Sequence, residues 1–401
     1  MFIGLSLDVL SPFLSRQKAA LILETGDYFP GLTKTPSAHV SGTLCFNTAM
    51  TGYQEAISDP SYRGQLLVFS FPHIGNVGTN PEDIESSFPF LQGIILGDFI
   101  TEASNYRSTS HFLSWLEKNN VPCIEGIDTR TLIHIIRDHK KPLKAIICSY
   151  TGELTPEKIL EMSNKGNFTD LTFEKSLLAQ VSTRKTYLWT QELSELIKSP
   201  QPSHASPSSP LKIVVVDFGV KQSTLRSLTS FGADVIVVPF SSSYEDILAH
   251  HPTGVVFSNG PGDPRFVEPS VFKMMEKILQ EGVPMLGVCL GHQLLSLVHG
   301  AEIIKLPCGH HGINHPVQDL NSKNILITSQ NHEYTIKESS LPKNLIPTYR
   351  SLFDGSLEGY KIQEKPIFSV QFHPEAGPGP GDATFILSDF LKIVRHHAQK
   401  N

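Results

Sequence analysis

The hydrophobic pattern of the second half of the chain predicts strands and helices in alternation. Short β-branched apolar runs, typical of strands buried on both faces, are separated by segments with helical spacing. Such alternation indicates an open, mostly parallel α/β sheet with helices on both faces. The strands are expected at 212–217, 234–239, 254–258 and 283–288, and the helices at 222–230, 244–250 and 290–299.

The first half of the chain has a different pattern, which predicts a separate domain of mixed α/β type. Its apolar runs lie at 19–23, 65–71 and 93–96, its helical patterns at 111–119 and 129–138, and a hairpin-like turn at 24–27.

The two halves are joined by a segment, 199–210, that consists almost entirely of Ser and Pro and can neither propagate a helix nor pair as a central strand. We therefore expect a linker at 199–210 between domains at 17–198 and 211–396. Residues 1–16 are apolar but contain Asp8 and Pro12, and no basic residue precedes Arg16, unlike a secretory signal. They are expected to form a disordered extension.

Composition narrows the class of protein. A hydrophobic fraction of 40% in 401 residues excludes wholesale disorder, and a net charge of -6 argues against a role on nucleic acid or membrane surfaces. No apolar stretch reaches the roughly 18 residues of a membrane-spanning helix. Five cysteines without a CxxC pair indicate a reducing compartment, so a cytoplasmic protein is expected.

The segment Gly287-Val-Cys289-Leu-Gly291-His-Gln293 has the pattern of a nucleophile elbow, in which a buried strand turns sharply into a helix. Cys289 then stands at a helix N-terminus, where unpaired N–H groups favour a thiolate. The same groups, beginning with that of Leu290, can hold an oxyanion. The alternative is a small buried cysteine at the end of a core strand.

A base for this thiol is offered by His373, at the end of the apolar run 368–372, and Glu375 follows within reach of its second ring nitrogen. His373 would take the proton of Cys289, and Glu375 would fix the tautomer and stabilise the imidazolium. The alternative is a histidine at a strand end with a solvated glutamate.

A third motif, Ser258-Asn-Gly260-Pro-Gly262-Asp-Pro264, follows the predicted strand at 254–258, at the edge where ligands collect in open α/β sheets. Its glycines permit close backbone approach to a ligand, and a backbone N–H could complete an oxyanion hole. It lacks the Gly-Lys-Ser/Thr ending of a P-loop, and a plain turn is the alternative.

Together these three motifs, in this order, resemble the class I (triad) glutamine amidotransferases over 212–395. The resemblance implies a flavodoxin-like fold and attack of Cys289 on the side-chain amide of L-glutamine. Ammonia would be released, and water would hydrolyse the glutamyl thioester that remains.

The first half resembles the small subunits of carbamoyl-phosphate synthase. The segments that carry the likeness are 46–55, 59–62, 71–80 and 126–130, with 309–316 in the second half. This resemblance implies a large-subunit partner that binds ATP and its metal ions and receives ammonia through a tunnel. No cofactor is expected in this chain itself.

By the same resemblance, glutamine would be bound by residues from both halves of the chain: Ser61, Gly260, Gly262, Leu290, Gln293, Asn331 and Tyr334. Three positions depart from the family pattern. Glu333 stands where glycine is usual and would be strained if its φ had to be positive. Gly377 and Gly381 replace a serine and a histidine.

Three alternatives stay open at this stage. Cys308, His310, His311 and His315 could suggest zinc, but they lack paired spacing, so no metal is expected and the segment is taken as a loop near the site or a partner. Another triad amidotransferase, such as the glutaminase of anthranilate synthase, would leave 46–80 unexplained. A catalytically silent scaffold is the third.

Overall fold

The computed structural model describes residues 16–34, 39–139, 141–165, 168, 177–194 and 211–400. They form two compact units. The first comprises the described residues of Met1–Thr51, Gly64–Asn80 and Leu91–Leu171, and the second those of Gly52–Arg63, Pro81–Phe90 and Thr172–Asn401. Apart from Arg16, the expected extension and the 199–210 linker lie outside the described residues. The domain boundaries at 17–198 and 211–396 stay a prediction.

The first unit contains a seven-stranded sheet in the order β2-β1-β7-β3-β4-β5-β6. Pairing is antiparallel from β2 to β3 and parallel from β3 to β6. Helix α4 packs Leu132 on one face, and α5 packs Met162 on the other, which confirms the expected mixed α/β architecture. The elements are β1 Gln17–Leu23, β2 Tyr28–Thr33, β3 His39–Asn47, β4 Gln65–Phe69, β5 Gly93–Leu96, α3 Phe112–Lys118, β6 Cys123–Ile124, α4 Thr129–His139, β7 Lys144–Ser149 and α5 Pro156–Lys165.

The second unit contains a ten-stranded sheet in the order β14-β13-β15-β16-β17-β12-β11-β9-β10-β8. Its central strands, from β17 to β10, are parallel, and the strands on either side are antiparallel. The strands are β8 Tyr187–Trp189, β9 Leu211–Asp217, β10 Ala233–Pro239, β11 Gly254–Phe257, β12 Met285–Val288, β13 Ile303–Asp319, β14 Ile325–Ile336, β15 Leu345–Ser351, β16 Leu357–Ile362 and β17 Ile367–Val370.

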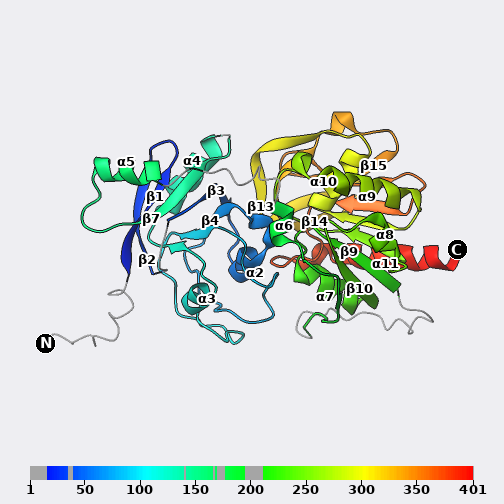
Figure 1. Cartoon of the computed structure of the whole chain (residues 1–401), viewed down its shortest axis with the longest axis horizontal. Coiled ribbons are helices and arrows are strands. Elements are labelled where there is room, and N and C mark those ends of the chain that lie inside the picture. The colour runs from blue at the N-terminus through cyan, green and yellow to red at the C-terminus, as the bar shows by residue number, and fades with distance from the viewer. Residues whose placement is uncertain are drawn as a thin grey trace. The chain divides into compact units, whose positions relative to one another are not determined.

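Helices cover both faces of this sheet, as expected (Figure 1). Along β9, Val214 and Val216 join the core beneath α9 and α10, while Ile213 and Val215 join the core beneath α7 and α11. Among the described residues, no helix has both the length and the apolar character needed to cross a bilayer. The helices are α2 Tyr53–Ser58, η1 Pro60–Tyr62, α6 Leu177–Val181, α7 Gln222–Ser230, α8 Tyr244–Leu248, η3 Pro264–Phe266, α9 Pro269–Gln280, α10 Leu290–Val298, η4 Glu338–Ser340, η5 Gly381–Ala383 and α11 Phe385–Lys400.

The segment from Cys308 to His315 lies within strand β13, so the expectation of a loop there is wrong. Glycines and prolines obscure the alternation that would mark a strand. The pairing of β13 with β14 is irregular between Lys305 and His310 and again between Gly312 and His315. Such bulges accommodate the irregular sequence within a long antiparallel ladder.

The parallel strands place their carboxyl ends at one edge of the sheet. The segments that follow β9, β11, β12 and β17 carry Lys221, Gly260, Cys289 and His373, respectively. Because β9, β11, β12 and β17 are neighbours in the sheet, these segments meet at the edge where open α/β sheets bind ligands.

Candidate functional site

Cys289 occupies a strained turn between β12 and α10, with φ 51° and ψ -103°. The flanking glycines make this turn sterically accessible. A Cβ on Gly291 would lie 2.1 Å from the backbone oxygen of Phe257, and one on Gly287 would lie 2.8 Å from the backbone oxygen of Gly291. The turn therefore requires glycine on both sides of a residue held in a sparsely populated backbone conformation, which is typical of functional sites.

The thiol of Cys289 is buried, with 3% of the residue exposed. Its Sγ donates a weak hydrogen bond to the backbone oxygen of Asn331 at 3.7 Å. Leu290 is the first residue of α10, where an N–H has no acceptor within the helix. The helix N-terminus therefore favours negative charge beside the sulfur, either on the thiolate or on an oxyanion.

His373 and Glu375 lie directly after β17 and are both buried. The His373 N–H donates to the backbone oxygen of Ser329 in β14 at 3.0 Å, and its Nδ1 lies 2.8 Å from Oε1 of Glu375. Nε2 makes no hydrogen bond of regular geometry within the described structure. The contact at Nδ1 orients the ring and leaves Nε2 for a proton exchanged with a reacting group.

The electrostatics of this pair favour its charged form. Burial alone would lower the pKa of His373, but the Glu375 carboxylate outweighs burial, and a contact with the Cys289 thiol adds to the effect, so the pKa is raised. Burial alone would raise the pKa of Glu375, but Lys221 and His373 hold it below its usual value. A buried imidazolium is thus stabilised beside the thiol.

Lys221 completes this charge arrangement and was not found from sequence. Its Nζ lies 3.3 Å from Oε1 of Glu375, and it donates a hydrogen bond to the backbone oxygen of Ala376. Burial would lower the pKa of Lys221, but Glu375, Glu85 and Asp59 together raise it. Its position in the sequence could have indicated a role in the site, because Lys221 follows β9 at the ligand-binding edge of the sheet.

The residues proposed to bind glutamine from the 258–264 turn and from η1 lie together. Oγ of Ser61 accepts a hydrogen bond from Nδ2 of Asn259 at 3.0 Å. A Cβ on Gly260 would lie 2.2 Å from the backbone oxygen of Phe218, and Gly262 has φ 93°. Glycine is therefore favoured at both positions, by steric clash at one and by positive φ at the other. The hydrogen bond between Asn259 and Ser61 fixes the turn against η1.

Two further predicted residues, Asn331 and Tyr334, lie on β14, which passes beside Cys289. Nδ2 of Asn331 donates to Oδ2 of Asp59 at 2.9 Å. The Tyr334 ring packs in the same buried cluster as Leu290. Nε2 of Gln293 donates to the backbone oxygen of Tyr334 at 2.9 Å and to Oε1 of Gln371 at 3.0 Å, so this amide holds β14 against α10.

Two departures from the family pattern have clear structural consequences. Glu333 lies within β14 and is not among the described non-glycine residues with positive φ, so its backbone is unstrained. Its carboxylate pairs with Lys305. Gly377 has φ 59°, and a Cβ there would lie 2.2 Å from Oε1 of Glu85, so a serine would require Glu85 to move. For Gly381 the structure gives no comparable constraint.

Within the described residues, one group of side chains has metal-ligand spacing: His310, His332 and Glu358, whose ligand atoms lie within 4.8 Å of one another. The ring nitrogens of His332 are both engaged, Nδ1 with the Tyr334 backbone oxygen at 2.8 Å and Nε2 with Oε1 of Gln330 at 2.9 Å. Because a metal would have to break these contacts, the donor set does not fit one. Cys308 is exposed.

His292, three residues after Cys289 in the sequence, has a different environment from His373. It is fully buried, and its Nδ1 lies 2.8 Å from Oγ of Ser369. Burial lowers its pKa to about 3, so it stays neutral at physiological pH. It contributes to packing against Tyr360 rather than to proton transfer at the thiol.

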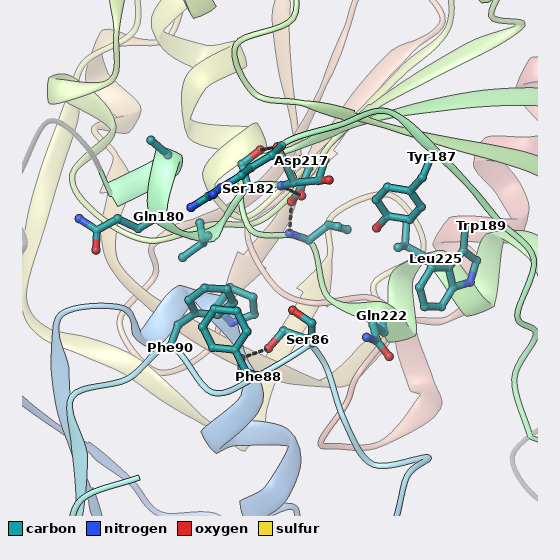
Figure 2. A pocket seen from close by; sticks show the side chains of 17 residues that line it. Ser86, Phe88, Phe90, Gln180, Ser182, Tyr187, Trp189, Asp217, Gln222 and Leu225 are labelled. Atoms are coloured by element: carbon teal, nitrogen blue, oxygen red, sulfur yellow. Dashed lines mark hydrogen bonds between the residues drawn. The ribbon is translucent and has the colours of Figure 1, made fainter. Parts of the chain in front are cut away.

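A cavity of about 500 Å³ lies elsewhere in the second unit (Figure 2). Pro60 and Val220, the sequence neighbours of Ser61 and Lys221, are among its lining residues, but none of the predicted site residues lines it. At its wall the Thr183 N–H donates a hydrogen bond to Oδ2 of Asp217 at 2.6 Å. Because Cys289, His373 and Glu375 are not among its lining residues, this cavity is not the Cys289 site.

Comparisons with known proteins match each half of the chain to a family model. The family model for glutamine amidotransferase class-I matches residues 214–393, and the model for the carbamoyl-phosphate synthase small chain, CPSase domain, matches 21–147. Among solved structures, a glutamine amidotransferase from Thermotoga maritima has a TM-score of 0.36 at 17% identity, over 47% of this chain and 97% of that one. This last likeness is too weak to bear on the assignment.

Curated relatives cover nearly the whole sequence. The carbamoyl phosphate synthase small chain of Salmonella typhi is 40% identical over 381 residues, which are 95% of this chain and 98% of that relative. The small chain of Pasteurella multocida is 41% identical over 379 residues, which are 94% and 96% of the two chains. A likeness across both halves excludes an amidotransferase of another kind. The chain belongs to the family of carbamoyl-phosphate synthase small chains, and its second half is a class I glutamine amidotransferase domain.

Proposed function

We propose that this chain hydrolyses L-glutamine to glutamate and ammonia and passes the ammonia to a large subunit for carbamoyl phosphate synthesis. The observation that carries the proposal is the buried arrangement of Cys289, in a strained turn at a helix N-terminus, with the His373–Glu375 pair. Such an arrangement is suited to nucleophilic catalysis of acyl transfer.

In the first half-reaction, Nε2 of His373 takes the proton of Cys289, and the sulfur attacks the amide carbon of glutamine. The N–H of Leu290, with a backbone N–H of the Gly260 turn, stabilises the oxyanion. The imidazolium then gives its proton to the leaving nitrogen, the C–N bond breaks, and ammonia departs. Glu375 holds the imidazolium in place.

The second half-reaction restores the thiol. His373 takes a proton from water as the water oxygen attacks the glutamyl thioester, the C–S bond breaks to give glutamate, and the imidazolium returns its proton to the sulfur of Cys289. Glutamine, and afterwards the glutamyl group, would be held by Ser61, Gly260, Gly262, Leu290, Gln293, Asn331 and Tyr334. Gln293 also bonds the Tyr334 carbonyl.

The partner would be the large subunit of carbamoyl-phosphate synthase, because the first unit matches the small-chain model of that enzyme. ATP and its metal ions would be bound by that partner, which would combine the ammonia with bicarbonate in the cytoplasm. This chain would need no cofactor of its own.

Release of glutamate from glutamine by the purified pair of subunits, with and without ATP and bicarbonate, tests the proposal. Hydrolysis that accelerates when ATP and bicarbonate are present is the expected result. An absence of glutamate release under every condition would instead favour a silent scaffold. A rate of hydrolysis that does not change with ATP and bicarbonate would show that the glutaminase activity is not coupled to carbamoyl phosphate synthesis.

A further inference from the structure

A second buried carboxylate, that of Glu85, lies in the same unit as the triad. Glu85 is 1% exposed and belongs to the segment Pro81–Phe90 of the second unit. Its Oε2 accepts a hydrogen bond from the N–H of Ser223 at 2.9 Å, and its Oε1 accepts one from Oγ of Ser223. Glu85 takes no part in the proposed proton transfers. The inference that follows rests on the proposed glutaminase function.

The backbone around Glu85 is fixed at the start of α7. The N–H of Gln222 donates to the backbone oxygen of Glu85 at 2.9 Å, and the N–H of Glu85 donates to Oγ of Ser58 at 3.0 Å. Nη1 of Arg226, within α7, donates to the backbone oxygen of Glu82 at 2.9 Å. The carboxylate is therefore held at a helix N-terminus, where unpaired N–H groups favour a negative charge.

The same carboxylate borders the turn that carries Glu375. A Cβ on Gly377 would lie 2.2 Å from Oε1 of Glu85, so the carboxylate lies against the backbone of Gly377. The preceding carbonyl, that of Ala376, accepts a hydrogen bond from Nζ of Lys221. Lys221 and Glu85 thus contact adjacent residues of the chain directly after Glu375.

Lys221 is the cation that the buried acids share. Its Nζ lies 3.3 Å from Oε1 of Glu375. Burial lowers the pKa of Lys221, but three carboxylates raise it: Glu375, Glu85 and Asp59. Burial raises the pKa of Glu85, although Lys221 and the hydrogen bonds from Ser223 oppose this rise. The charge on Glu85 therefore changes how much of the lysine's field remains uncompensated.

The lysine carries this effect to the base of the proposed mechanism. Burial lowers the pKa of His373, Glu375 raises it, and Lys221 lowers it. A lysine whose charge is offset by Glu85 lowers that pKa less. An ionised Glu85 should therefore favour the imidazolium form of His373, although none of the described hydrogen bonds joins the two residues.

We propose that Glu85 is a positioning residue of the glutaminase, which supports the turn after Glu375 and offsets the charge of Lys221, and thereby strengthens proton binding at the catalytic pair. A role confined to capping α7 is the alternative. Capping predicts a loss of stability in variants of Glu85 without a change in the ionisation of Cys289 and His373.

The test uses the two-subunit enzyme and measures kcat/KM for glutamate release from L-glutamine between about pH 5 and pH 9, since the acid limb of this profile reports the ionisation of the free enzyme. Glu85→Gln removes the charge and nearly keeps the size of the side chain, whereas Glu85→Asp keeps the charge. Glu82→Gln is the matched control, because Glu82 lies in the same segment but is exposed.

For Glu85→Gln we expect the acid limb to move to lower pH by about 0.5 to 1 pH unit, because the uncompensated charge of Lys221 disfavours protonation nearby. Glu85→Asp and Glu82→Gln should leave the limb within about 0.2 pH unit of wild type. In a Lys221→Met background, Glu85→Gln should move the limb no further, because its effect passes through the lysine.

Alkylation of Cys289 by iodoacetamide follows the same ionisation without turnover, so it serves variants of low activity. It is measured in a Cys308→Ser background, because Cys308 is exposed and would also react. Its pH midpoint should move with the acid limb. If Glu85→Gln does not fold, Ser223→Ala replaces it: loss of one hydrogen bond to the carboxylate should move the limb in the same direction by less.

An acid limb that stays in place while Glu85→Gln loses stability would overturn the proposal and assign Glu85 to capping alone. A shift of the same size with and without Lys221 would also overturn it. Both results leave glutamine hydrolysis by the wild-type enzyme intact. A wild-type enzyme that releases no glutamate defeats the proposed function, and the inference with it.

Discussion

Nζ of Lys221 lies 3.3 Å from Oε1 of Glu375, and both side chains are buried. The same carboxylate oxygen lies 2.8 Å from Nδ1 of His373. One buried acid is thus placed between two cations, which keeps it ionised. Its charge is therefore available to stabilise an imidazolium at His373 during proton transfer.

Replacing this acid should slow glutamine hydrolysis strongly. In Glu375→Gln, His373 loses the carboxylate that raises its pKa and fixes its orientation. We expect kcat for glutamate release to fall roughly 10³- to 10⁴-fold, as when the acid of a triad is made neutral. Glu276→Gln, on the exposed side of α9, is the control, and equal rates in the two variants would contradict the role of Glu375.

The same variant should reveal the pair in the pH dependence of stability. The pKa of Glu375 is lowered on folding, so its contribution is present above its ordinary value of 4.5 and is lost as pH falls through the folded value. The pKa of His373 is raised, so its contribution is present below 6.5 and is lost as pH rises through the folded value.

The full contribution of the pair therefore lies between about pH 4.5 and pH 6.5. Urea unfolding of wild type and Glu375→Gln across the pH range measures it. The difference in unfolding free energy should be largest in this window and shrink on either side. A difference that does not vary with pH would show that the pair is not charged in the folded protein.

Removing the buried lysine should destabilise the protein. Lys221→Met leaves Glu375, Glu85 and Asp59 without their shared cation, and loss of one member of a buried ion pair costs about 3–5 kcal/mol. Lys212→Met, at an exposed position of β9, should stay within about 0.5 kcal/mol of wild type in the same urea titration. Comparable losses for both lysines would refute this account.

Gly291, two residues after Cys289, should not tolerate even one methyl group. In Gly291→Ala the new Cβ would meet the backbone oxygen of Phe257 at 2.1 Å, so the turn has to shift and glutamine hydrolysis should fall at least 10²-fold. Gly381→Ala is the control, because its Cβ would meet only Thr384, at 3.8 Å. Full activity of Gly291→Ala would show that glutamine hydrolysis does not need this conformation of the turn.

Local sequence signals predicted the central elements of the second unit well. The β-branched runs of β9, β10 and β11 are buried on both faces, so their composition alone marks them as strands. The glycines beside Cys289 have a steric cause that leaves a short motif. The two-residue spacing of His373 and Glu375 suffices to bring their side chains into contact.

Other features depend on contacts between distant segments and leave no local pattern. Lys221 is an unremarkable lysine in sequence, and only the fold brings Asp59, Glu85 and Glu375 around it. Residues 52–63 and 81–90 precede much of the first unit in sequence but belong to the second unit. Strand β13 was missed because its bulges break the periodicity on which strand prediction depends.

Synthesis of carbamoyl phosphate by the two-subunit enzyme, with either glutamine or ammonium as nitrogen source, tests the central claim most directly. The serine hydroxyl is a much weaker nucleophile than the thiol at neutral pH. Cys289→Ser should therefore abolish synthesis from glutamine and leave synthesis from ammonium near the wild-type rate. Loss of both activities together, or retention of both, would contradict Cys289 as the nucleophile that supplies ammonia to the large subunit.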